Sequence, residues 1–395
     1  MLRLLLRLIK ATQSFFCHSR MVGITLFDIH FSLASSLYCD KMCRLLFFEN
    51  KFFPGWNKKS ADVEVETVEE RTYGTDVNQV EITSLNKIQG QKKAIELLKV
   101  NLDAYFQSRQ TGNPGSFGGV LFCGPSGTGK TLVAKALHAE LGNLDLIETN
   151  GEMISNASEL IAILLSATKE TTIFIDECQG MSSRSQNILL TALSERVIYV
   201  PKHRNNKSKR VIPLENFTLL LATTHEYYLQ EALRNRMRVY CRFEHYALED
   251  LIEIIRQRAL ALKWDIESQQ VLIEIAKRSK KTPRLALNRN LQQCWNVCSS
   301  QGRTVITMQD VTEAFRLLQI DELGLDELER RYLRILHHEG PSPLNVISSK
   351  LALPTQTIKT VLEPLFLQEG LIQKNKCSHR ELTDTGKQHI QNVQL

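Results

Sequence analysis

Two kinds of apolar pattern alternate through the middle of this chain. Short apolar runs, which are typical of buried strands, occupy residues 118–123, 144–149, 171–176 and 217–224. Between them lie amphipathic stretches with helical spacing, such as LVAKALHAEL at residues 132–141. Strands that alternate with helices build a parallel sheet covered by helices. We therefore predict an α/β domain over residues 81–245.

The pattern becomes purely helical after residue 245. Helical spacing runs through residues 248–262, 268–280, 285–300 and 307–319. This predicts a small helical domain over residues 246–319. From residue 320 on, three helical stretches precede two β-prone runs, GLIQKN and HRELT, which flank a polar turn. That order is typical of a winged helix, which we place at residues 320–395.

The N-terminal part differs from the rest in charge. Residues 1–60 hold nine Lys or Arg and three acids, which accounts for the whole net charge of +6. Any basic footprint in the remaining chain must therefore be local. Residues 61–80 read as an acidic, polar linker, and we expect residues 1–80 to be poorly ordered. A targeting segment and a start assigned too early, with Met21 or Met42 as the true initiator, both fit residues 1–60.

Apolar runs and cysteines indicate in which cellular compartment the protein is expected. No run reaches the roughly 18–20 apolar residues that span a bilayer, so we expect no membrane association. The nine cysteines form no paired CxxC pattern, which favours reduced thiols over a zinc site or disulfides. We predict a cytoplasmic protein.

A complete phosphate-binding motif, GPSGTGKT, joins the first strand to the following helix. It matches GxxxxGK[ST] and carries Gly124, Gly127, Thr128, Gly129, Lys130 and Thr131. Glycines let backbone N–H groups close on phosphate oxygens, and the helix N-terminus adds partial positive charge. Lys130 can reach the β- and γ-phosphates, and the Thr131 hydroxyl can ligate Mg²⁺. The motif predicts binding of ATP with Mg²⁺.

Acidic, polar and basic residues follow the later strands. Asp176 and Glu177 end the third strand, where Asp176 can bind Mg²⁺ and Glu177 can deprotonate the attacking water. Thr224 ends the fourth strand and can sense the γ-phosphate. Arg236, in LRNR, can reach a neighbouring subunit's nucleotide as an arginine finger. Ordinary strand-end and surface residues are the bland alternative for Thr224 and Arg236.

The lid offers one more candidate. Thr282 and Pro283 suit the N-cap and first position of a helix. Arg284 then extends from the start of that helix, where it can touch a γ-phosphate.

Taken together these motifs resemble the RuvB family of Holliday-junction branch-migration motors, which belongs to the AAA+ superfamily. The resemblance runs from about residue 82 to 390 and rests on the phosphate loop, IDE, ATT, LRNR, KTPRLAL and DELGLDELERRYL. It implies an AAA+ P-loop domain, a helical lid and a C-terminal winged helix. It also implies a DNA translocase that assembles as a ring, with a hexamer expected.

The resemblance assigns roles residue by residue. It implies that Lys130 and Thr131 bind phosphate and Mg²⁺, and that Asp176 and Glu177 form the acidic pair. Thr224 would be a sensor, Arg236 the finger acting in trans and Arg284 the lid sensor. Ile88, in IQGQ, falls near the adenine position, although Gln89 shifts that segment relative to the family's IGQ.

Basic residues suggest where DNA is contacted. From residue 320 on there are 9 basic and 10 acidic residues, so we expect DNA contacts only at the wing, at Lys374, Lys376 and Arg380. A solvated turn is the bland alternative. Residues 196–217 occupy the place of a hairpin that in the family docks the accessory protein RuvA. Because residues 202–210 are basic and polar here, a phosphate contact and a RuvA-like partner both stay open.

Other functions remain to be excluded. A clamp or helicase loader and a protein remodeller share the AAA+ fold. A remodeller would want an aromatic pore loop, which residues 150–154 do not supply. A non-catalytic DNA-binding adaptor is disfavoured by the intact Lys130, Asp176, Glu177 and Arg284.

Overall fold

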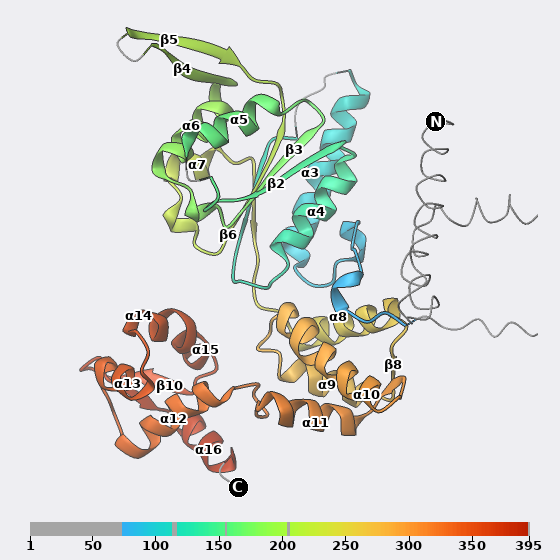
Figure 1. Ribbon diagram of the computed structural model, residues 1–395, viewed down its shortest axis with the longest axis vertical. Helices are drawn as coiled ribbons and strands as arrows, with labels where there is room; N and C mark the ends of the chain where they lie inside the picture. Colours follow the sequence, from blue (N-terminus) through green and yellow to red (C-terminus); the bar gives the residue numbers. More distant parts are fainter. Residues whose placement is uncertain (1–72, 113–116, 155, 204–205, 394–395) are drawn as a thin grey trace, which may run out of the picture. The chain divides into compact units, whose positions relative to one another are not determined.

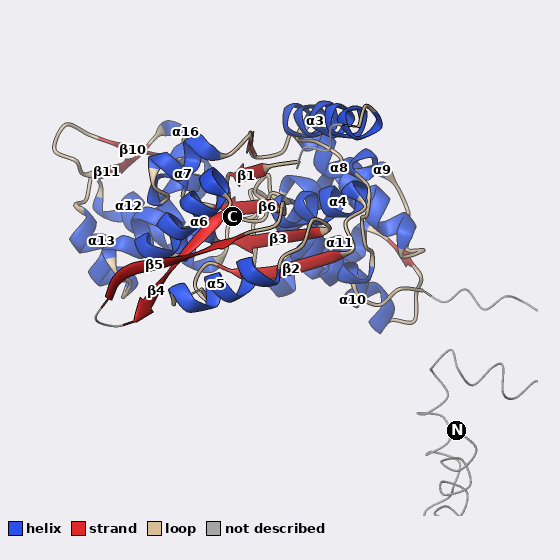
Figure 2. Ribbon diagram, turned by 90° about the horizontal axis from the view of Figure 1, so that it is seen from above, coloured by secondary structure: helices blue, strands red, loops and turns tan. Residues whose placement is uncertain are grey.

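The computed structural model describes residues 73–112, 117–154, 156–203 and 206–393, with the backbone alone for residues 201–203 and 206–209. The expected leader and most of the expected linker lie outside these residues. Figures 1 and 2 show the arrangement of the described elements.

A five-stranded parallel sheet forms the centre of the α/β domain. Its strands are β1 (Gly119–Cys123), β2 (Asp145–Asn150), β3 (Thr171–Asp176), β6 (Thr218–Thr223) and β7 (Val239–Arg242), in the order β2-β3-β6-β1-β7. The four predicted strands are confirmed. The fifth, β7, was not predicted, because arginines at 238 and 242 shorten its apolar run to three residues.

Helices cover both faces of this sheet because alternate strand residues point to opposite sides. Val120 and Phe122 of β1 pack with α3 (Lys92–Gln110) and α4 (Lys130–Leu141). Leu121 packs on the other face with α5 (Ala157–Ser166), α6 (Ser183–Glu195) and α7 (Glu231–Arg236). All five β1 residues are buried, as a strand covered on both faces requires.

The expected hairpin follows α6. Strands β4 (Val197–His203) and β5 (Asn206–Pro213) pair antiparallel, with a register shift between Pro201 and His203. The hairpin projects beyond α5 and α6 (Figure 1). Tyr199 and Val211, which face each other across the two strands, are both exposed. The basic residues at 202–209 belong to the part whose side chains are not described.

The lid is helical, as predicted. It contains α8 (Leu248–Ala261), α9 (Gln269–Lys277), η5 (Leu285–Leu291), α10 (Gln292–Ser300) and α11 (Met308–Leu318), with a short parallel pair β8 (Asp265–Ile266) and β9 (Val305–Ile306). Its core includes Trp264 and Trp295, whose rings stack 4.6 Å apart.

Residues 73–80 pack against this lid, so the expectation of a poorly ordered linker does not hold for them. Val77, in η1 (Val77–Gln79), is 1% exposed within the lid core. Trp264 Nε1 donates to the carbonyl of Gly74 at 2.7 Å, and Arg258 Nη1 donates to the carbonyls of Val77 and Val80. The polar composition of the segment hides this role, because its backbone carbonyls make most of the contacts.

The third domain has the expected helix–strand order. It contains α12 (Glu327–Glu339), α13 (Leu344–Leu351), α14 (Thr355–Thr357), η6 (Ile358–Leu362) and α15 (Glu363–Gln368), followed by an antiparallel wing of β10 (Ile372–Lys374) and β11 (Arg380–Leu382). A last helix, α16 (Asp384–Val393), was not predicted. It packs on the same core through Ile390.

Arg380 does not face solvent, so the expectation that it contacts DNA is wrong. The residue is 6% exposed, and its Nε donates to Glu363 Oε1 at 2.7 Å. Glu363 is itself 1% exposed and also lies 3.4 Å from the Tyr332 hydroxyl. The guanidinium is the buried partner of this carboxylate, and the ion pair holds the wing on α15.

Among the described residues, no helix is long and apolar enough to cross a membrane.

We expect Arg380→Ala to destabilise the winged helix by about 3–5 kcal/mol, because it removes the buried partner of the Glu363 carboxylate and leaves only the exposed Lys374, 3.6 Å away. Hydrogen exchange of the β10 and β11 amides would measure the effect locally. Lys376→Ala, at an exposed position of the same wing, is the control and should change little. Equal protection in both variants would show that the ion pair does not hold the wing.

Candidate nucleotide site

The phosphate loop joins β1 to α4 and depends on glycine at three positions. Gly124, Gly127 and Gly129 have φ angles of +150°, +76° and +95°. A Cβ at Gly124 would lie 2.4 Å from the carbonyl oxygen of Phe243, and one at Gly127 would lie 2.7 Å from Thr282 Cγ2. Both conformation and space therefore exclude larger residues.

Lys130 opens α4 with its side chain folded along the loop. Its Nζ donates to the carbonyls of Gly124 and Pro125, both at 2.9 Å, and the residue is 6% exposed. Burial lowers the pKa of Lys130, and the carboxylates of Glu177 and Asp176 act in the opposite direction. The loop is braced by Thr128, whose hydroxyl donates to the carbonyl of Pro125 at 2.8 Å.

Two oxygen-bearing side chains meet beside Lys130. The Thr131 hydroxyl donates to Asp176 Oδ2 at 2.7 Å. Asp176 Oδ1 accepts from the backbone N–H of Glu177 at 2.8 Å, which fixes the carboxylate. Parallel strands end at the same edge, so the end of β3 comes to the start of α4, as the sequence predicted.

Glu177 and Thr224, which were predicted separately, are in contact. Glu177 lies in the left-handed region at φ 42°, and its Oε2 accepts from the Thr224 hydroxyl at 3.1 Å. The same oxygen accepts from Gln179 Nε2 at 2.6 Å. Gln179, in η3 (Cys178–Gly180), was missed, because a glutamine in a turn carries no motif.

Arg236 is not part of this cluster. It is the last residue of α7, is exposed, and donates from Nη2 to the carbonyl of Ser194 at 3.3 Å. Ser194 belongs to α6, so this bond holds the guanidinium against the C-terminal end of α6 rather than at the phosphate loop.

Two residues of the lid, Arg284 and Tyr246, form hydrogen bonds to the phosphate loop. Arg284 Nη1 donates to Ser126 Oγ at 3.2 Å, and its backbone N–H donates to the carbonyl of Gly127 at 3.4 Å. Tyr246, at the start of the lid, donates its hydroxyl to the carbonyl of Thr128 at 3.0 Å. The helix of Arg284 begins at Pro283 as expected, but the Thr282 hydroxyl donates to the carbonyl of Lys280 at 2.9 Å rather than capping that helix.

Two cavities lie beside each other at the loop. The first, about 220 Å³, is lined by Lys130, Thr131, Asp176, Glu177 and Arg284 among others. The second, about 470 Å³, is mainly apolar and is lined by Ile88, Val80, Tyr246 and further residues. They share Gly129, Leu132, Pro283 and Leu287. A charged cavity beside an apolar one suits the phosphates and base of a nucleotide.

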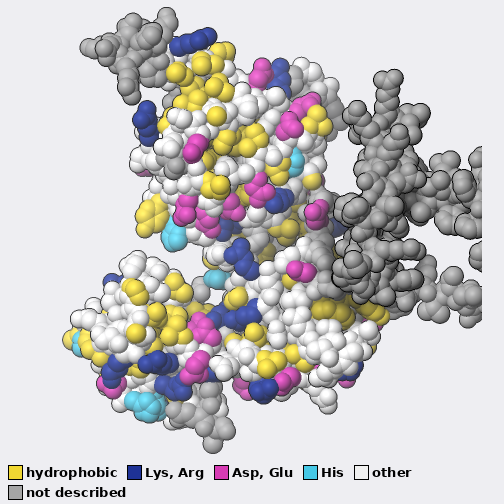
Figure 3. Space-filling model, in the orientation of Figure 1, with side chains coloured by type: hydrophobic (Ala, Val, Ile, Leu, Met, Phe, Trp, Pro, Cys, Tyr) yellow, Lys and Arg dark blue, Asp and Glu magenta, His cyan; other side chains and the backbone are white. Residues whose placement is uncertain are grey.

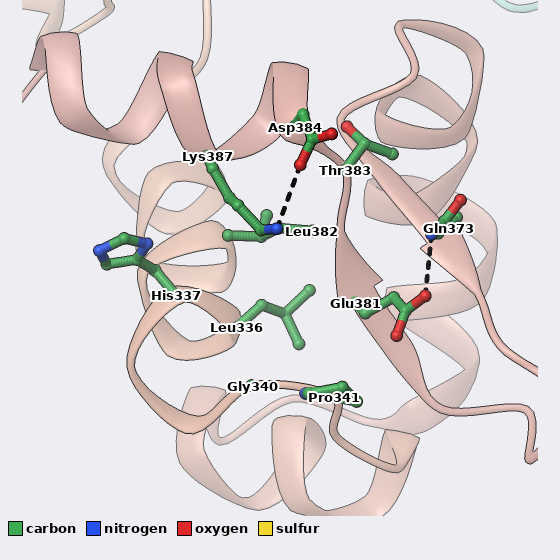
Figure 4. A pocket seen from close by; sticks show the side chains of 10 residues that line it. All are labelled: Leu336, His337, Gly340, Pro341, Gln373, Glu381, Leu382, Thr383, Asp384 and Lys387. Atoms are coloured by element: carbon green, nitrogen blue, oxygen red, sulfur yellow. Dashed lines mark hydrogen bonds and ion pairs between the residues drawn. The ribbon is translucent and has the colours of Figure 1, made fainter.

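Another cavity, of about 520 Å³, lies on the winged helix (Figure 4). Its charged side chains are already paired, because Lys387 Nζ lies 3.2 Å from Asp384 Oδ1 and Gln373 donates to Glu381 at 2.8 Å. It therefore offers no convergent free charge for a ligand.

The wing leaves two of the three predicted DNA contacts exposed. Lys374 and Lys376 are exposed, and Lys374 Nζ lies 3.6 Å from Glu363 Oε2. On the face seen in Figure 3, Lys and Arg side chains are interspersed with Asp and Glu rather than gathered in one continuous patch.

Comparison with known proteins gives a consistent result across the chain. Residues 80–243 match the Holliday junction DNA helicase RuvB P-loop domain, residues 246–321 the RuvB AAA lid domain, and residues 322–391 the RuvB C-terminal winged helix domain. Similar solved structures include the Thermotoga maritima RuvB Holliday junction branch migration motor, at 27% identity and a TM-score of 0.66, over 79% of this chain and 98% of that one.

Two variants of the same Thermotoga maritima protein are also similar. Both have TM-scores of 0.67 over 79% of this chain, with 27% and 26% identity, and 99% and 98% of their own lengths are covered. Since all three domains match one family in order, the chain belongs to the RuvB family of Holliday junction DNA helicases, P-loop ATPases that bind ATP and DNA.

Proposed function

We propose that this chain hydrolyses ATP at the interfaces of a ring of identical subunits and thereby drives branch migration of four-way-junction or duplex DNA. The observation that carries the proposal is the set of contacts joining Thr131 to Asp176 and Thr224 to Glu177, directly beside the buried Lys130. These residues lie at or directly after the ends of β3 and β6 and in the first turn of α4, and they would form one catalytic edge.

The phosphate loop and Lys130 would hold the ATP phosphates. Lys130 now donates to two loop carbonyls, and a γ-phosphate would offer the ammonium a charged acceptor instead. Arg284 is placed against Ser126, on the other side of the loop. The apolar cavity with Ile88 would take the adenine.

Thr131 and Asp176 fit the oxygen ligands that Mg²⁺ prefers, since a hydroxyl and a carboxylate meet there at 2.7 Å. When bound, Mg²⁺ would neutralise charge that develops on the phosphate oxygens. Asp176 is held for this task by the Glu177 N–H.

Glu177 would act as the general base for the attacking water. Its Oε2 is held by Thr224 and Gln179, whereas Oε1 accepts no hydrogen bond from any residue that the structure describes. That oxygen is left to accept a proton from water. Thr224, adjacent to the base, would place the water and the γ-phosphate.

Arg236 would act on a neighbouring subunit. It is exposed and lies outside the cluster of its own chain, which a finger acting in trans requires. This motivates the ring, with a hexamer as the expected size.

DNA would be contacted through the wing at Lys374 and Lys376. The hairpin of β4 and β5, with exposed Tyr199 and Val211 near its base, could serve DNA or a RuvA-like accessory protein. A cytoplasmic location stays a prediction.

The ATPase rate of a branch-migration motor should rise when its DNA substrate is present. We expect four-way-junction DNA to raise the ATPase rate of the full chain several-fold above the rate without DNA. Single-stranded DNA of equal nucleotide content is the control. An ATPase indifferent to all DNA would favour a loader or a protein remodeller, and a chain with no ATPase would favour a DNA-binding adaptor.

Substitutions at Lys130 and Glu177 should separate binding from hydrolysis. Lys130→Ala should abolish ATP binding, because it removes the buried cation. Glu177→Gln keeps the size but loses the base, so we expect normal binding and a kcat lowered about 10²–10⁴-fold. Binding is measured with a fluorescent ATP analogue and turnover by phosphate release. Normal turnover of Glu177→Gln would remove its assigned role.

Mixing two inactive variants tests the role of Arg236. Arg236→Ala should bind ATP nearly normally and hydrolyse it about 10³–10⁵-fold more slowly. Mixed with Lys130→Ala protein, it should regain activity wherever an intact Lys130 site meets an intact Arg236. No recovery at any ratio, in mixtures that co-assemble, would place Arg236 outside the neighbouring site.

A further inference from the structure

Gln179 lies at the centre of the candidate catalytic edge, although no motif includes it. It is half-buried in η3, the turn that follows β3. The preceding Cys178 is fully buried in the core and anchors the turn. The buried Cys178 therefore fixes the backbone of the turn that carries Gln179.

The turn itself leaves little freedom. Glu177 has a left-handed conformation, which a residue with a Cβ adopts at a cost. Gly151 packs so closely that a Cβ there would lie 2.4 Å from the Glu177 carbonyl oxygen, and its N–H donates to the Asp176 carbonyl at 2.8 Å. This packing turns Gln179 back toward the carboxylate.

Hydrogen bonds fix the orientation of the Gln179 amide. Its Nε2 lies 2.6 Å from Glu177 Oε2, and a carboxylate oxygen at that distance requires a donor. Its Oε1 accordingly accepts from the buried Thr223 hydroxyl at 2.6 Å. Thr223 in turn accepts from the His225 N–H at 3.0 Å, so each group in this chain has a defined direction.

The same amide also reaches Thr224. Gln179 Nε2 lies 3.1 Å from Thr224 Oγ1, and the Thr224 hydroxyl donates to Glu177 Oε2. One side chain thus ties the acidic end of β3 to two residues at the end of β6.

We propose that Gln179 is a positioning residue for ATP hydrolysis, whose amide holds the Glu177 carboxylate against Thr224 and fixes both to the end of β6. The proposal rests on the proposed function, because it assigns Gln179 an action through Glu177. Gln179 keeps Oε2 occupied, so that Oε1 alone meets the attacking water. Loss of the amide would let the carboxylate rotate away from the water.

Gln179→Met tests this with a side chain of similar length that cannot donate. In the full-length protein we expect kcat to fall about 10–100-fold, within the range that general-base catalysis supplies, while KM and ATP-analogue binding change less than about threefold. In the Glu177→Gln background the same substitution should add less than about twofold, because both changes act through one group.

The split between kcat and KM is the readout that a purely structural role would not give. General loosening of the turn would weaken ATP binding together with turnover, whereas loss of positioning alone lowers kcat at an unchanged KM.

Gln270→Met is the matched control, because Gln270 makes a similar amide–carboxylate contact, 3.1 Å from Glu274, on an exposed face of the lid. It should leave kcat and KM unchanged. The proposal is overturned if Gln179→Met keeps kcat within twofold or loses nucleotide binding. It is also overturned if the double variant's loss of kcat equals the product of the two single losses. An unmodified protein without ATPase, or normal turnover by Glu177→Gln, would instead overturn the proposed function.

Discussion

The close packing around the phosphate loop is the constraint on which the rest of the site depends. A Cβ at Gly124 would strike the carbonyl of Phe243, just after β7, and one at Gly127 would strike Thr282 in the lid. The loop therefore touches the sheet edge on one side and the lid on the other. Because the backbone fills that space, Tyr246 and Arg284 can bond to loop atoms directly. A change in loop shape would therefore alter the contacts of the lid directly.

Local chemistry was predictable where it follows one chain segment. The phosphate loop, the IDE strand and the helical lid each carry their own signal, so Lys130, Asp176 and Thr224 could be placed from their neighbours in the sequence alone. Residues whose environment depends on distant segments could not be placed from the sequence. Arg380 reads as a wing cation, yet its partner Glu363 lies 17 residues earlier. The contacts of Gln179 exist only because β3 and β6 end side by side in the sheet. Strand β7 has four residues, too few to show an alternation of apolar and polar positions.

Charge at the candidate catalytic edge is balanced within a small volume. Lys130 is buried beside Glu177 and Asp176, and both carboxylates favour its charged form while burial opposes it. The Asp176 carboxylate is satisfied by a hydroxyl and a backbone N–H, and Glu177 by a hydroxyl and an amide. Neutral donors therefore orient both acids, which leaves their negative charge available to a cation or a proton.

The contact of residues 73–80 with the lid bears on how the chain can be processed. Val80 also lines the apolar cavity, so the segment contributes both to the lid core and to the wall of that cavity. Translation from Met21 or Met42, or removal of a leader before Tyr73, would keep every one of these contacts. Cleavage a few residues later would instead remove Gly74 and Val77 from the lid and open one side of the apolar cavity. Packing would therefore limit any removal of N-terminal residues to positions before Tyr73.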